Sequence, residues 1–136
     1  MIEPCGVLAD IGTDHGQLPL MVLKAGLADK VIATDISEGS LAKAETYRLF
    51  DCRLGDGLSV LKYGEADTVV IAGMGARTIS KMLERDCGAK RYILSSQSEV
   101  GKFREFLNKN NFKIIKEETV SDRKHMYSIF VCERNI

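Results

Sequence analysis

The sequence predicts an α/β fold with a mostly parallel, twisted sheet, and three observations carry that prediction. An apolar run at residues 7–9 leads into a turn with glycines at 12 and 16. A longer apolar run at 68–72 leads into a second glycine turn at 73–75. Amphipathic segments follow both runs, and apolar strands alternating with helices are typical of parallel sheets covered on both faces. The length of 136 residues, 45% of them hydrophobic, predicts a single domain over 1–136.

The first half of the chain alternates helices and strands after the opening run. Leu18, Met21 and Val22 share one face of the first helix, which Gly26 is well placed to end. Ser37 or Ser40 is expected to cap the second helix. The expected elements are a helix at 17–26, a strand at 30–34, a helix at 41–48 and a strand near 49–53.

The second half continues the alternation and ends in two strands. The link at 121–125 between these strands is short enough for an antiparallel hairpin. Phe103 and Phe106 are expected to be packing residues, whereas Met74 is expected near a ligand. The expected elements are a strand at 68–72, a helix at 77–87, a strand at 91–95, a helix around 100–107, and strands at 112–120 and 126–132.

Two acids in the first glycine turn indicate what kind of ligand it binds. Dinucleotide sites place glycine where the chain leaves the first strand, so that backbone amides face a pyrophosphate. Here Asp10 stands at that place and Asp14 follows it. Carboxylates repel phosphate but attract S-adenosylmethionine, which carries a sulfonium and an ammonium and no phosphate. The alternative is that both acids only cap the following helix.

Two further acids fit the same ligand. Asp35 ends the second strand 19 residues after Gly16, close to the spacing at which a carboxylate accepts the ribose hydroxyls of a nucleoside. Asp56 lies between Gly55 and Gly57, in a loop that could meet an adenine edge. A helix cap for Asp35 and a plain turn around Asp56 are the alternatives.

Composition excludes several other classes. No run approaches the roughly 18 apolar residues of a membrane span, so a cytoplasmic protein is expected. Four widely spaced cysteines without a Cys-x-x-Cys pair indicate neither a metal site nor a disulfide framework. Net charge is zero, but residues 1–88 sum to −4 and residues 89–136 to +4. The basic second half could face a polyanion or could simply be solvated.

Three motifs resemble the bacterial tRNA (adenine-22-N1) methyltransferase family, and the likeness covers nearly the whole chain. They are the stretches at 9–19 (ADIGTDHGQLP), 53–58 (RLGDGL) and 70–75 (VIAGMG), with 106–107 and 111–115 adding to them. The resemblance implies a Rossmann-like class I methyltransferase fold that transfers a methyl group from S-adenosylmethionine to N1 of an adenine in tRNA.

The resemblance also implies roles for individual residues. It places Asp10 and His15 near the methionine part of the cofactor, Asp35 on its ribose and Asp56 near its adenine. Gly75 and Gln97 are candidates for orienting the substrate adenine. The full set expected to contact the cofactor is Asp10, Gly12, Thr13, His15, Gly16, Asp35, Ile36, Asp56, Gly57, Gly73 and Met74.

Compared with the family pattern, the chain is expected to be a shortened member. It starts almost at the first strand, ends at the hairpin without a C-terminal helical extension, and looks shortened between 43 and 53. Ala76 and Ser98 replace a usual glycine and proline. Exposed edges make a homodimer plausible. The alternatives are a cofactor-binding homologue without tRNA methylation and a nicotinamide-dependent oxidoreductase, against which Asp10 argues.

Overall fold

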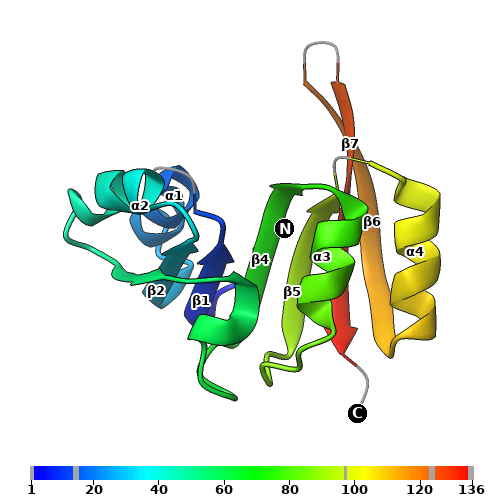
Figure 1. Cartoon of the computed structure of the whole chain (residues 1–136), viewed down its shortest axis with the longest axis horizontal. Helices are drawn as coiled ribbons and strands as arrows, with labels where there is room; N and C mark the ends of the chain where they lie inside the picture. Colours follow the sequence, from blue (N-terminus) through cyan, green and yellow to red (C-terminus); the bar gives the residue numbers. More distant parts are fainter. Residues whose placement is uncertain (1, 14–15, 97, 123–124, 135–136) are drawn as a thin grey trace.

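A computed structural model of the chain describes residues 2–13, 16–96, 98–122 and 125–134. Within these residues, seven strands form one sheet flanked by helices (Figure 1). The elements are β1 (Cys5–Ile11), α1 (Gln17–Lys24), β2 (Ala28–Asp35), α2 (Glu38–Glu45), β3 (Asp51–Leu54), the short 3-10 helix η2 (Gly57–Val60), β4 (Thr68–Met74), α3 (Ala76–Leu83), β5 (Arg91–Ser96), α4 (Val100–Lys109), β6 (Phe112–Asp122) and β7 (His125–Arg134).

The strand order β3-β2-β1-β4-β5-β7-β6 confirms the predicted mixed sheet. The first five strands in that order are parallel, whereas β7 runs antiparallel to both β5 and β6. The chain builds outwards from β1 to β3 on one side and restarts with β4 on the other side. This reversal between β1 and β4 is where open α/β sheets leave a crevice at the carboxyl ends of their strands.

The two faces of the sheet carry separate apolar clusters, as expected for strands buried on both sides. Ala9 and Ile11 of β1 join the cluster under α3 and α4, which includes Ile79 and Phe103. Leu8 joins the opposite cluster, in which α1 contributes its buried valine. Figure 1 shows α3 in front of the strands next to β5, and α4 beside β6.

The predicted helices exist, but their ends differ. The second helix begins at Glu38 rather than residue 41, because the Ser37 hydroxyl accepts a hydrogen bond from Ser40 N (3.3 Å) and starts the helix there. The third helix ends at Leu83 rather than 87, because the chain turns to join another loop, with Gly64 N donating to Cys87 O (2.8 Å). The hydrophobic pattern continues through such turns, so it overstates helix length.

A half-buried guanidinium, that of Arg53, closes the loop between β3 and β4. Arg53 donates to both carboxylate oxygens of Glu65 (2.5 and 2.7 Å), to Asp51 (2.8 Å) and to the Val60 carbonyl (2.9 Å). These hydrogen bonds lower the pKa of Glu65 to about 2. The clamp ties together the two ends of the loop that carries Asp56, and so fixes where that loop stands.

We predict that Arg53→Met lowers the free energy of unfolding at pH 7 by about 1–3 kcal/mol, because Asp51 and Glu65 would lose charged donors. Urea unfolding measures this change. Because the pKa of Glu65 is depressed, the difference between wild type and variant should persist above about pH 4.5 and shrink as pH falls towards 2.

Arg104→Met is the matched control for this clamp. The Arg104 side chain is 43% exposed and pairs with Glu117 at 2.6 Å on the surface. Exposed pairs contribute little to stability, so the control should lose much less than Arg53→Met. Equal losses in the two variants would contradict the clamp.

Candidate functional site

The carboxyl ends of β1, β2, β3 and β4 surround a cavity of about 200 Å³, at the place where the sheet reverses its order. Six residues of the predicted cofactor set line it: Gly12, Asp35, Ile36, Asp56, Gly57 and Met74. Five lining residues were not predicted: Ile11, Thr34, Gly55, Thr78 and Met82. The structure therefore brings three separate sequence motifs to one site.

The first turn uses its own backbone amides. Gly12 N and Thr13 N both donate to the Thr34 carbonyl (3.0 and 2.8 Å), and Gly16 N donates to the Thr13 carbonyl (3.3 Å). A pyrophosphate site needs such amides to face the ligand. In the described part of this turn they are already bonded, which argues against a dinucleotide site.

Gly12 allows the first turn to approach Met74, on the β4 side of the cavity, closely. Its φ of 73° is left-handed, and a Cβ there would lie 2.6 Å from Met74 Cε. The side chain of Met74, at the end of β4, therefore lies directly over the Gly12 backbone. A larger residue at 12 would push Met74 into the cavity.

Asp10 is a buried acid directly behind this turn. Its exposure is 4%, and loss of solvation raises its pKa to about 7. The Asp35 charge raises the pKa further, and the Thr13 hydroxyl partly opposes the shift. That hydroxyl nevertheless makes no hydrogen bond of normal geometry with any described residue, and the same holds for the buried Thr34 hydroxyl. A buried carboxylate beside the Thr13 hydroxyl, which has unused hydrogen-bonding capacity, suits a cationic ligand.

Asp35 ends β2 with its carboxyl group held in place. Its exposure is 9%, and its Oδ1 accepts a hydrogen bond from Ser37 N (2.9 Å). The Asp35 carbonyl accepts one from Gly55 N (3.0 Å), which joins this strand end to the next loop. Ser37 supplies the capping oxygen of α2, so Asp35 is not that cap. Asp35 lines the cavity, where its carboxylate could accept hydrogen bonds from the hydroxyls of a nucleoside ribose.

Asp56 and Ile36 complete the wall formed by β2 and β3. Asp56 precedes η2, but its carboxylate makes no capping hydrogen bond. Instead the Asp56 carbonyl accepts from Ser59 N (3.2 Å) and Ser59 Oγ (2.5 Å). Ile36 is 75% exposed although it lines the cavity. An acid and an exposed apolar side chain together suit the edge and face of a flat heterocycle.

Several predicted residues lie elsewhere or outside the described residues. Gly16 allows helix packing, since a Cβ there would lie 2.9 Å from Ala44 Cβ. Gly73 faces open space, and a Cβ at Gly75 would lie 3.3 Å from Ser98 Oγ. Asp10, Thr13, Gly16, Gly73 and Gly75 are not among the lining residues of the cavity. The predicted roles of His15 and Gln97, and the acid at 14, fall outside the described residues.

Two of the five missed residues come from α3. Thr78 and Met82 are four positions apart and therefore share one face of the helix. The only signal in the sequence is that this helix directly follows the second glycine turn. Among the described residues, no group of histidines, cysteines and acids could hold a metal ion, and no helix meets the length and apolarity that a membrane span requires.

Comparisons with known proteins agree with this geometry. A tRNA (adenine(22)-N(1))-methyltransferase of Bacillus subtilis is 34% identical over 138 residues, which cover 93% of this chain and 58% of that protein. The crystal structure of the B. subtilis M1A22 tRNA methyltransferase TrmK matches with a TM-score of 0.90 at 33% identity, covering 98% of this chain and 62% of that one.

A structure of M. capricolum TrmK in complex with S-adenosyl-homocysteine also matches, with a TM-score of 0.90 at 28% identity over 99% of this chain and 65% of that one. The chain spans 58–62% of the length of the curated relatives it matches. These matches confirm the resemblance indicated by the three motifs. Since the model of the methyltransferase domain family also matches residues 1–130, the chain belongs to that family.

Proposed function

We propose that this chain binds S-adenosylmethionine and transfers its methyl group to N1 of an adenine in tRNA. The observation that carries the proposal is the pairing of a buried carboxylate, Asp10, with a first turn whose described amides are bonded internally. That combination favours a cationic ligand over a phosphate. The names of the B. subtilis and M. capricolum relatives support the same ligand and acceptor.

The residues present fit the cofactor part by part. The Asp10 carboxylate would balance its positive charge, with the Thr13 hydroxyl close by. Asp35, oriented by Ser37 N, would accept the ribose hydroxyls. Asp56 would meet the adenine edge, and Ile36 and Met74 would cover its faces. The roles of His15, Gly16, Gly57 and Gly73 stay predictions from the family motif.

The transfer requires positioning more than acid–base chemistry. When bound, S-adenosylmethionine supplies an electrophilic methyl group on a positively charged sulfur. The adenine N1 lone pair forms the new N–C bond while the C–S bond breaks and its electron pair stays on sulfur, so no residue has to remove a proton from N1. The chain has to hold N1 in line with that bond. N1 is a Watson–Crick atom, so the base must be unpaired or flipped out. Gly75 and Gln97 stay the proposed groups that orient it.

We predict that Asp35→Ala weakens S-adenosylmethionine binding roughly 10- to 100-fold, because charge-assisted hydrogen bonds of about 1.5–3 kcal/mol are lost. Calorimetric titration measures this, with NAD as the control ligand, which should not bind. The control variant is Asp29→Ala, which removes an exposed acid near the opposite end of the same strand. An unchanged dissociation constant for Asp35→Ala, with the fold intact, would remove Asp35 from the site.

A second prediction concerns Asp10 and pH. Its folded pKa of about 7 lies well above its ordinary value of 3.8, so the folded protein keeps a proton that the unfolded chain releases between about pH 4 and 7. Without ligand, the free energy of unfolding should therefore fall by about 3–4 kcal/mol across that range. Asp10→Asn should flatten this dependence, which denaturant unfolding at pH 5 and 8 measures.

Ionisation of Asp10 should strengthen ligand binding, although it lowers the free energy of unfolding of the ligand-free protein. The ionised form of Asp10 attracts the cation, so S-adenosylmethionine affinity should rise from pH 6 to 8. Asp10→Asn should bind more weakly and lose that pH dependence. If its affinity and pH profile matched those of the wild type, the ligand would not be using Asp10.

Transfer of a labelled methyl group to a tRNA transcript tests the reaction itself. The control transcript carries guanine in place of adenine 22, the position named for the B. subtilis relative. Labelling only of the adenine-containing transcript is the expected result. Binding of the cofactor without labelling of either transcript would favour the alternative, a cofactor-binding homologue without tRNA methylation.

A further inference from the structure

One side of α3 carries cations that the fold does not use. Arg77, Lys81 and Arg85 are exposed. Arg77 and Lys81 are four residues apart in α3 and therefore project from the same side of the helix. Arg85 lies in the bend that follows the helix and lines the same hollow as Lys81. None of the three has a carboxylate within 4.0 Å among the described residues. The opposite side of the helix carries its buried residues, Ala76, Ile79 and Leu83.

Four other arginines of the described chain contrast with these, whereas exposed Arg48 also has no carboxylate within 4.0 Å among the described residues. Arg53, Arg91, Arg104 and Arg134 each pair with a carboxylate at 2.5–3.7 Å. Like charges four residues apart destabilise a helix slightly. A row of unpaired cations on α3 is therefore a small cost to the fold, and an anionic partner would offset it.

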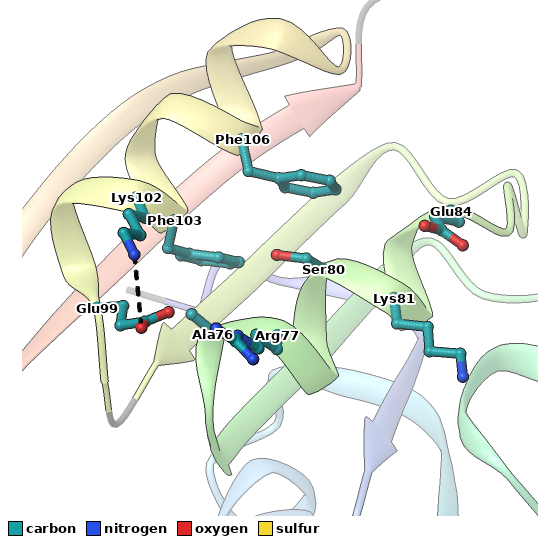
Figure 2. Close-up of a pocket in the computed structure, with 9 residues that line it drawn as sticks. All are labelled: Ala76, Arg77, Ser80, Lys81, Glu84, Glu99, Lys102, Phe103 and Phe106. Carbon is teal, nitrogen blue, oxygen red and sulfur yellow. Dashed lines mark ion pairs between the residues drawn. The ribbon is translucent and has the colours of Figure 1, made fainter.

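Two hollows connect this row to the cofactor cavity. The first, of about 430 Å³, shares Asp56, Thr78 and Met82 with the cavity and adds Lys81 and Arg85. The second, of about 500 Å³, lies between α3 and α4, and we call it the α3–α4 groove (Figure 2). Lys81 lines both hollows, so the cations follow a path from the cavity to the groove.

Aromatic rings form the α4 wall of the α3–α4 groove. Figure 2 shows Phe103 and Phe106 pointing from α4 towards α3, and their rings are stacked with centroids 6.4 Å apart and planes 11° apart. Phe103 is buried at 1% exposure, whereas Phe106 is only partly buried. Phe106 is thus an apolar ring that the groove leaves in reach of a ligand. Sites that bind single-stranded nucleic acid commonly combine cations, which contact the phosphates, with an accessible aromatic ring, on which a base stacks.

The acids of the groove leave its charge positive. Glu99 pairs with Lys102 at 3.8 Å, so these two charges offset each other. Glu84 is the remaining acid of the lining and has no described cation within 4.0 Å. The same lining contains Arg77 and Lys81, whose two positive charges outnumber the one negative charge of Glu84. A polyanion would gain from the two cations and be opposed by one carboxylate.

We propose that the RNA strand next to the target adenine crosses α3, with phosphates against Arg77, Lys81 and Arg85 and a neighbouring base against Phe106 in the α3–α4 groove. The inference rests on the proposed function, because the adenine must enter the cavity that the first hollow adjoins. It assigns RNA contact to the methyltransferase domain itself.

The test compares tRNA binding and cofactor binding in the same variants. The double variant Arg77→Glu/Lys81→Glu should bind a tRNA transcript at least tenfold more weakly at 50 mM salt, measured by fluorescence anisotropy. The slope of log affinity against log salt should become shallower by about 1.5, since two phosphate contacts are lost. Its S-adenosylmethionine affinity should stay within twofold of wild type, because neither residue lines the cofactor cavity.

Lys113→Glu is the matched control. Lys113 is exposed, has no carboxylate within 4.0 Å among the described residues, and pairs in register with Glu133, which lies beside Arg91 at the start of β5. It therefore stands at the end of the sheet opposite the cavity. This reversal makes the same change in charge as one substitution on α3 and should leave tRNA affinity nearly unchanged.

Two single substitutions separate the charges from the ring. Glu84→Gln should tighten tRNA binding about two- to threefold, because it removes the repelling charge. Phe106→Leu should weaken it up to about tenfold without changing the salt slope, because leucine keeps the apolar packing but removes base stacking.

The outcomes distinguish the two proposals. If the α3 double variant binds tRNA as wild type does, the proposed RNA contact across α3 is wrong while the cofactor site stands. The same conclusion holds if wild type binds S-adenosylmethionine but no tRNA at 50 mM salt. If wild type binds no S-adenosylmethionine, the proposed function fails instead. Weakening of tRNA binding by Lys113→Glu equal to that of the α3 variant would also overturn the specific surface.

Discussion

Burial of the Asp10 carboxyl group is the constraint on which the site depends. An isolated acid at 4% exposure is unfavourable as an anion, and its pKa of about 7 records that cost. The fold tolerates it because the carboxyl group can hold a proton when no cation is near. Binding of a cation would reverse the balance and favour the charged form. The same residue thus makes the empty site less stable at neutral pH and the loaded site more stable.

The walls of the cavity are held together by hydrogen bonds between neighbouring strand ends. The first turn is bonded to the end of β2 through the Thr34 carbonyl, and the end of β2 is bonded to the next loop through Gly55 N. The Arg53 clamp closes that loop from behind. Consecutive strand ends are therefore linked to one another, which fixes the spacing of the acids at 10, 35 and 56.

Sequence reasoning predicted residues that the structure places in the cavity lining where they lie on strand ends and in glycine turns. Asp35 and Gly12 could be placed because the spacing of βα units and the conformation of a tight turn are local properties. Thr78 and Met82 could not, because their contribution depends on how α3 docks across the sheet. At Gly16 the structure shows a packing reason for glycine, since a Cβ there would lie 2.9 Å from Ala44 Cβ, and its role towards the cofactor stays a prediction.

The charge distribution shows why the ion pairs of the folded chain have to be known before a polyanion-binding surface is inferred. Counting along the chain assigns the basic excess to residues 89–136. In the structure, Arg91, Arg104 and Arg134 of that half are paired with acids, whereas the unpaired row stands on α3 in the acidic half. Pairing neutralises charge locally, so what a polyanion meets is the unpaired remainder and not the sum. In this chain one group of unpaired cations, Arg77, Lys81 and Arg85, lines the hollows next to the cavity at the strand ends, where the proposed reaction would bring the methyl acceptor.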